Sequence, residues 1–236
     1  MTNGKTLGIL GGVGPMATVS FMDMIVRMTK AEKDQEHIDM IVLNHATIPD
    51  RTAYILNNSS ENPLPVMVRD AQRLEAAGAD LIVIPCNTAH YFYDEISAGV
   101  DIPVLNIIEE AVDYARKNVP ELKKLGLLAT QGTIAAGSYE KVCRKYGIDY
   151  SVPSDENQQK VMDIIYNGVK AGKEIDFNSF LQIIEDMKND GCDAVILGCT
   201  ELSVIHDKYC MNRPDVIDSM LVLAKRSITE CRKEII

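Results

Sequence analysis

The chain has 236 residues, of which 46% are hydrophobic and 25% are charged, and its formal net charge is −10. This composition predicts a soluble globular protein, long enough for one large domain or two small ones, and argues against intrinsic disorder. Because no cluster of Lys and Arg exceeds a pair such as Lys123-Lys124, the acidic balance also argues against a surface for nucleic acid or for an anionic membrane.

The N-terminal stretch MTNGKTLGILGGVGP has only a short apolar run that glycines interrupt, which fits neither a signal peptide nor a spanning helix. The six cysteines show no CxxC spacing and the four histidines are scattered. We therefore expect free thiols, no metal site and a cytoplasmic protein that does not associate with membranes.

Short apolar runs alternate with helical patterns along the chain, which is typical of βαβ units around a parallel sheet. The predicted strands are 6–10, 39–43, 80–84, 103–105, 124–129 and 193–197. The predicted helices are 16–31, 64–77, 88–98, 107–118, 134–146, 156–170, 177–190 and 218–233. Three glycines stand where helices should end, at Gly78, Gly147 and Gly191.

The two halves of the chain repeat one another. LGILGGVGP at 7–15 resembles LGLLATQGT at 125–133, and GADLIVIPCNT at 78–88 resembles GCDAVILGCTE at 191–201. The second match aligns Asp80 with Asp193 and Cys86 with Cys199. The sequence therefore predicts an α/β protein of two pseudo-symmetric lobes, each a mostly parallel sheet flanked by helices, with residues 1–105 plus 214–236 in the first lobe and 106–213 in the second.

Each matched cysteine comes directly after a predicted strand, at the edge of the sheet where open α/β sheets bind ligands. If two such lobes face each other, Cys86 and Cys199 face one cleft. Two thiols on opposite sides of a carbon suit removal of a proton from one face and delivery of a proton to the other, which inverts that carbon. The alternative is that both cysteines only fill the core.

Six stretches together resemble the cofactor-independent aspartate/glutamate racemase family, and within it the aspartate racemases. They are GILGGVGPMAT at 8–18, IPDRTAYIL at 48–56, PCNTAH at 85–90, LLATQGT at 127–133, YNGVKAG at 166–172 and GCTELS at 198–203. The resemblance implies two lobes around a cleft, a homodimer, and racemisation of a small acidic amino acid by two cysteines with no cofactor, neither pyridoxal phosphate nor metal.

The same resemblance identifies Cys86 and Cys199 as the catalytic pair, and Arg51 and Lys170 as the cations that hold the substrate carboxylates. An arginine fork grips a carboxylate through two hydrogen bonds, and two cations suit a dicarboxylate. Further substrate-binding residues are expected among the polar side chains nearby: Asn87, Thr88, Thr130, Thr133, Thr200 and Glu201.

Several of these residues allow a second interpretation. Asn87 and Thr200 also suit helix N-caps, and Glu201 also suits the first turn of a helix. His90, four residues after Cys86, raises the possibility of a Cys-His hydrolase, although we expect a packed or solvent-facing histidine. The turn GGVGP lacks the GxGxxG spacing of a dinucleotide site, so we expect a tight turn that lines the cleft.

Other functions remain compatible with this sequence. A glutamate or broader-specificity racemase is a close variant, and a maleate isomerase would keep the fold and the cysteines. An arylmalonate decarboxylase would retain only one of the two cysteines. A protein of a different class, which binds an acidic amino acid without turnover, would keep its ligand affinity after Cys86→Ser, whereas a racemase would lose most of its activity.

Overall fold

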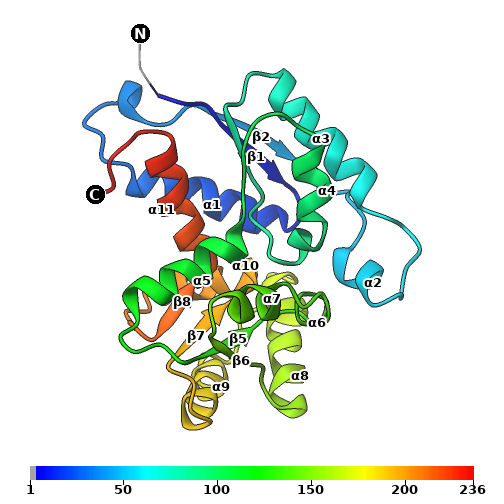
Figure 1. Ribbon diagram of the computed structural model, residues 1–236, viewed down its shortest axis with the longest axis vertical. Helices are drawn as coiled ribbons and strands as arrows, with labels where there is room; N and C mark the ends of the chain where they lie inside the picture. The colour runs from blue at the N-terminus through cyan, green and yellow to red at the C-terminus, as the bar shows by residue number, and fades with distance from the viewer. Residues whose placement is uncertain (1–3) are drawn as a thin grey trace.

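Two parallel four-stranded sheets organise the computed structural model, which describes residues 4–236 (Figure 1). The strand order is β2-β1-β3-β4 in the first sheet and β6-β5-β7-β8 in the second, so both sheets have one topology. The predicted architecture of two pseudo-symmetric lobes is confirmed. The strands are β1 Leu7–Gly11, β2 Met40–Asn44, β3 Leu81–Val83, β4 Val104–Leu105, β5 Lys124–Leu128, β6 Asp149–Ser151, β7 Ala194–Leu197 and β8 Val216–Asp218.

Helices cover both faces of each sheet, which is why the central strands β1, β3 and β7 have no polar side chain and are entirely buried. The α-helices are α1 Pro15–Met28, α2 Arg51–Ile55, α3 Leu64–Ala76, α4 Tyr93–Ala98, α5 Ile107–Asn118, α6 Gln131–Ala135, α7 Ser138–Lys145, α8 Asp155–Asp163, α9 Phe177–Asn189, α10 Thr200–Lys208 and α11 Ser219–Glu230. The chain also forms the 3₁₀ turns η1 Asp34–Glu36 and η2 Thr88–Phe92, and the π-helical segment η3 Ile164–Val169.

The repeated aspartates, Asp80 and Asp193, make equivalent hydrogen bonds in the two lobes. The Asp80 carboxylate accepts a hydrogen bond of 2.7 Å from the backbone N–H of Thr6, just before β1, and the Asp193 carboxylate accepts one of 2.8 Å from Lys124, where β5 begins. Each aspartate therefore ties the strand that follows it to the first strand of its lobe. The sequence repeat reflects equivalent positions in two equivalent sheets.

The predicted boundary at residue 214 needs a correction. Val216–Asp218 forms β8, which pairs with β7 and so belongs to the second sheet. The helix that follows, α11, lies against the first lobe, where it packs on α1, and it also contacts α5 (Figure 1). The prediction missed β8 because three residues are too short to show a period.

Three predicted helices are divided in the structure. The stretch 134–146 is broken by Gly137, whose φ of 66° lies in the left-handed region and separates α6 from α7. The stretch 88–98 consists of η2 and α4. The stretch 156–170 begins as α8 but ends in η3, where the Lys170 N–H donates to the carbonyl of Ile165, five residues back, at 3.0 Å.

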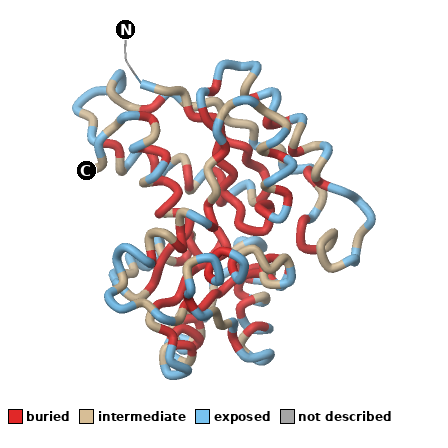
Figure 2. The backbone as a smooth tube through the Cα atoms, in the orientation of Figure 1, coloured by how far each residue is buried: buried red, intermediate tan, exposed pale blue. Residues whose placement is uncertain are grey.

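The two lobes share a hydrophobic core. Figure 2 shows buried backbone running through each lobe and across the junction between them. One continuous cluster of buried side chains includes Phe21 and Ile107 together with Leu125 and Leu223. Because this cluster spans both sheets, it fixes the relative position of the lobes and of the strand ends that meet between them.

Candidate active site

A narrow cavity lies between the lobes, and both Cys86 and Cys199 line it. Nine of the ten predicted site residues line this cavity, and Thr133 is the exception. Three further lining residues were not predicted, namely Asp50, Thr52 and Tyr166, whereas Val13 belongs to the GGVGP turn. The cavity opens into a wider mouth that shares Arg51, Lys170 and Glu201 with it and is lined by the turn at Gly12 and Gly14, as predicted for GGVGP.

The two thiols occupy equivalent places at the carboxyl ends of β3 and β7. After β3 the chain turns sharply, because the Cys86 N–H donates to the Ile84 carbonyl at 2.7 Å, and η2 begins two residues later. Cys199 is the extended residue at the N-cap of α10, with φ of −143°. The first N–H groups of α10 therefore lie next to the Cys199 side chain and favour negative charge there.

Cys199 nevertheless holds its proton. Its thiol is buried and donates a hydrogen bond of 3.0 Å to Oε2 of Glu201. Burial raises the pKa of the Cys199 thiol well above its ordinary value, and the charge of Glu201 raises this pKa further. Burial and the neighbouring carboxylate therefore favour the protonated thiol at one wall of the cavity.

Arg51 has unused hydrogen-bonding capacity inside the cavity. It is the first residue of α2, which Asp50 caps, and its side chain is 8% exposed. Nη1 donates to the carbonyls of Pro49 at 3.1 Å and Ile48 at 3.4 Å, whereas Nε is buried without a partner. Between residues 4 and 236, no carboxylate lies within ion-pair distance of this guanidinium. A buried, unpaired cation of this kind points to an anionic ligand.

Lys170 supplies a second cation at the rim of the cavity. Its ammonium lies 4.2 Å from the centre of the Tyr166 ring, a distance at which a cation is attracted to the aromatic face. Burial lowers the pKa of this ammonium, but Glu201, Tyr166 and the two thiols outweigh that effect, so the pKa of Lys170 is raised. Although Lys170 is an exposed residue overall, its charged end thus lies among the groups of the cavity.

Threonine hydroxyls form one wall of the cavity. Thr88 contacts Thr130 at 3.1 Å and Thr133 at 2.8 Å, and Thr52 donates to Thr130 at 3.4 Å. Thr133 lies behind the other two hydroxyls because it is on α6, whose N-terminus Thr130 caps. On this wall, Thr52, Thr88 and Thr130 line the cavity, and Thr133 supports them from behind.

The N-cap prediction is wrong for Thr200, and Asn87 occupies the N-cap position of η2 without capping it. Asn87 does precede η2, but its side chain makes no capping hydrogen bond. It bonds instead to the hydroxyls of Tyr139 at 2.7 Å and Ser219 at 3.0 Å. Thr200 is the first residue of α10, and the N-cap is Cys199. Both residues line the cavity, where donation to a ligand or thiolate remains a prediction.

His90 is a packed histidine and not the base of a Cys-His pair. Its Nε2 accepts a hydrogen bond of 3.2 Å from the Ile107 N–H, which leaves the proton on Nδ1, and Nδ1 donates to the Cys86 carbonyl at 2.8 Å. Complete burial lowers the pKa of His90 to about 4. The ring thus supports the backbone of Cys86 in a neutral form and does not face the thiol.

Tyr166 and Thr52 are the functional candidates that the sequence analysis missed. Thr52 directly follows Arg51, and Tyr166 stands four residues before Lys170, so proximity to the two predicted cations was the available signal. Tyr166 reaches the cavity because η3 places it and Lys170 on one side of a π-helical turn, a geometry that often occurs at functional sites.

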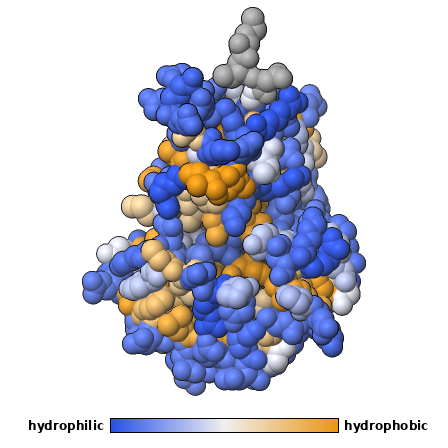
Figure 3. Space-filling view, turned by 90° about the vertical axis from the view of Figure 1, so that its left-hand side faces the viewer, coloured by the Kyte–Doolittle hydropathy of each residue, from blue (hydrophilic) through white to orange (hydrophobic). Residues whose placement is uncertain are grey.

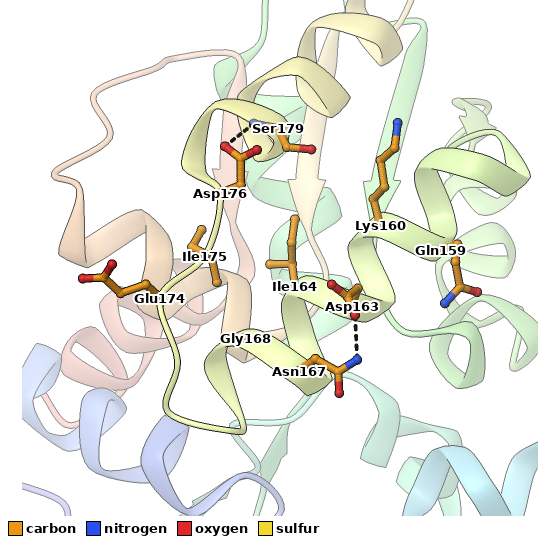
Figure 4. Close-up of a pocket in the computed structure, with 10 residues that line it drawn as sticks. All are labelled: Gln159, Lys160, Asp163, Ile164, Asn167, Gly168, Glu174, Ile175, Asp176 and Ser179. Carbon is orange, nitrogen blue, oxygen red and sulfur yellow. Dashed lines mark hydrogen bonds between the residues drawn. The ribbon is translucent and has the colours of Figure 1, made fainter.

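A separate hollow lies against other residues of α8 and η3 and the N-terminus of α9 (Figure 4). Several of its polar side chains already have partners within the protein: Asn167 donates to Asp163 at 2.6 Å, and Asp176 accepts from the Ser179 N–H at 3.1 Å. None of the predicted site residues lines it. The interlobe cavity is therefore the candidate active site.

Residues 4–236 show neither a metal-binding cluster nor a helix that could span a membrane. No group of three or more His, Cys, Asp or Glu side chains in this range is arranged to hold a metal ion. No helix in the same range has the length and apolar character needed to cross a membrane.

Comparisons with known proteins agree on one family. The family model described as Asp/Glu/Hydantoin racemase matches residues 10–226. The broad-specificity amino-acid racemase RacX of Bacillus subtilis is 29% identical over 231 residues, which cover 94% of this chain and 96% of that protein. A solved structure of Picrophilus torridus aspartate racemase is 32% identical, with a TM-score of 0.81, over 99% of this chain and 96% of that one. An aspartate racemase homologue from Pyrococcus horikoshii is 25% identical, with a TM-score of 0.76, over 97% and 99%.

Proposed function

We propose that this chain, which belongs to the Asp/Glu/Hydantoin racemase family and is therefore a racemase, interconverts L- and D-aspartate with two cysteine bases and no cofactor. The observation that carries the proposal is the pair of thiols at equivalent strand ends on the wall of one small cavity. Two further observations support it: the buried guanidinium of Arg51, whose Nε has no partner, and the similarity to an aspartate racemase over almost the whole chain.

The cations select the substrate in this proposal. Nη1 of Arg51 is occupied by backbone carbonyls, so Nε and Nη2 remain to form a two-point contact with one carboxylate. Lys170 holds the second carboxylate from the rim, supported by the Tyr166 ring. The two positive charges also offset the negative charge that develops when the α-proton leaves. A dicarboxylate held between the lobes satisfies both cations.

The thiols exchange one proton for another across the α-carbon. The Cys86 thiolate takes the α-proton, and the electron pair of the broken C–H bond delocalises into the adjacent carboxyl group. The Cys199 thiol, which starts protonated beside Glu201, delivers its proton to the opposite face of the carbon. The enzyme is left with a Cys86 thiol and a Cys199 thiolate, which is the form that catalyses the reverse reaction.

The test is to incubate the purified chain with L-aspartate, without added cofactor, and to measure D-aspartate by chiral chromatography. We expect D-aspartate to accumulate until the two enantiomers are equal, because free enantiomers have equal energies. Parallel incubations with glutamate, with other amino acids and with maleate separate the alternatives. Faster turnover of any of these compounds would contradict the proposed substrate, and binding of aspartate without turnover would show a non-catalytic protein.

We also propose a homodimer, with the cytoplasm as its location. Apolar side chains are exposed on α1, where Met16, Val19 and Val26 are 64%, 52% and 43% accessible. Apolar patches among hydrophilic side chains are visible on the face in Figure 3. Exposed apolar side chains of this kind support association with a second copy. Light scattering on the eluting protein should give twice the chain mass of 26.1 kDa, and a single-chain mass would contradict the dimer.

A further inference from the structure

A buried group of side chains connects the two lobes directly behind the thiols. Both polar atoms of the Asn87 side chain have a partner: Oδ1 accepts from the Tyr139 hydroxyl at 2.7 Å, and Nδ2 donates to Oγ of Ser219 at 3.0 Å. Ser219 in turn donates to the Leu197 carbonyl at 2.7 Å. Asn87, Tyr139 and Ser219 are each no more than 2% exposed. Water therefore does not compete for these hydrogen bonds.

The ends of this hydrogen-bonded chain lie beside the two reacting groups. Asn87 is the residue after Cys86, in the first lobe, and Leu197 is the last residue of β7, two positions before Cys199. A path of two hydrogen bonds, from Asn87 through Ser219 to Leu197, thus links the backbone that carries one thiol to the backbone that carries the other. The orientation of the amide is also fixed. Ser219 donates its own proton to the Leu197 carbonyl, so it can only accept from the Asn87 nitrogen, and the Asn87 oxygen is left to accept from Tyr139.

Ser219 is itself held firmly. It is the first residue of α11, and the preceding Asp218 caps that helix by accepting from the N–H groups of Met220 at 2.9 Å and Leu221 at 3.2 Å. Oδ1 of Asp218 also accepts from the hydroxyl of Ser203, which lies on α10, the helix that Cys199 begins. The anchor for Asn87 is therefore joined to both β7 and α10, the two elements that place Cys199.

We propose that Asn87, Tyr139 and Ser219 are positioning residues that set the distance and alignment between the Cys86 and Cys199 thiols. The inference rests on the two-thiol mechanism proposed above. Because proton transfer across one carbon tolerates little displacement, a shift of about 1 Å is expected to slow the reaction by about a hundredfold. The substrate carboxylates are held by other residues, so binding should change much less than turnover.

The test uses Tyr139→Phe and Ser219→Ala, which remove the two partners of Asn87 while leaving the thiols and the cations in place. Tyr150→Phe is the matched control: Tyr150 lies on β6 in the same lobe, and within residues 4–236 its hydroxyl makes no hydrogen bond. Each folded variant is assayed for racemisation. It is also treated with dibromobimane, a reagent that becomes fluorescent when it bridges two thiols, and peptide mass mapping identifies the bridge between Cys86 and Cys199.

We expect kcat to fall by about 10- to 100-fold in the first two variants, with KM within about threefold of the unmodified protein. Bridging should slow by about tenfold relative to alkylation of Cys86 alone, and Tyr150→Phe should change neither quantity. Unchanged bridging in both variants would overturn the inference. Since bridging does not depend on turnover, this readout decides the question even if aspartate proves not to be the substrate.

Discussion

Substitution of Arg51 by lysine tests how the cavity holds its ligand. Arg51 donates through Nη1 to two backbone carbonyls, which leaves a two-point edge of Nε and Nη2 for a carboxylate. A hydrogen bond to a charged group contributes about 1.5 to 3 kcal/mol. Lysine keeps the positive charge, but its single ammonium group replaces the two parallel N–H donors that Arg51 offers to a carboxylate, so one such hydrogen bond is lost. At 1.4 kcal/mol for each factor of ten, kcat/KM for aspartate should fall by about 10- to 100-fold.

Initial rates of D-aspartate formation over a range of L-aspartate concentrations give this ratio. The matched control is Arg69→Lys, an exposed arginine on α3 that lies outside the cavity. We expect the control to behave like the unmodified protein and the Arg51→Lys loss to appear chiefly in KM. A KM within a factor of two of the unmodified protein would refute the role of Arg51 as a carboxylate clamp.

Three further substitutions probe charge and strain. Glu201→Gln removes the carboxylate that helps to raise the pKa of Cys199, so the midpoint pH of Cys199 alkylation should decrease. An unchanged midpoint would show that Glu201 does not control the protonation of Cys199. The pKa of His90 is about 4 in the folded protein and 6.5 in the unfolded chain, so protonation at low pH favours unfolding. The contribution of the neutral ring to the free energy of unfolding is therefore present above pH 6.5 and is lost as the pH falls towards 4. Urea unfolding should show about 2 kcal/mol less stability at pH 5 than at pH 7 from this group, and His90→Gln should lose that dependence. Gly12→Ala would place a Cβ 2.2 Å from the backbone of His45 at a φ of 85°, so urea unfolding should show a loss of more than about 3 kcal/mol.

The fold was predictable because the apolar strands and the sequence repeat carry local signals. Cys86 and Cys199 each follow a strand that is buried on both faces, and the matched Gly-x-Asp segments before them align the two halves without any knowledge of contacts. A strand end at a fixed edge of a parallel sheet then places a thiol in the cleft. These two site residues follow from the sequence pattern alone.

The remaining site residues depend on tertiary contacts or on irregular backbone. Arg51 was identified only by resemblance, since nothing local distinguishes it from a solvated loop residue. The apolar spacing of 156–170 is compatible with an α-helix throughout, so the π-helical turn that brings Tyr166 to the cavity left no periodic signal. Tyr139 contacts Asn87 across 52 positions of sequence. This contact depends on how the two lobes are arranged, so no local sequence pattern could predict it.

The central claim is that two thiols act on opposite faces of one carbon, and the fate of deuterium at that carbon tests it most directly. L-aspartate is converted in deuterated water, and both enantiomers are separated at low conversion for mass analysis. If one thiol removes the proton and the other supplies a solvent-derived one, D-aspartate should carry deuterium at the α-carbon while the remaining L-aspartate keeps its proton. D-aspartate that retains the original proton, or L-aspartate that gains deuterium as fast as D-aspartate forms, would contradict the two-thiol account.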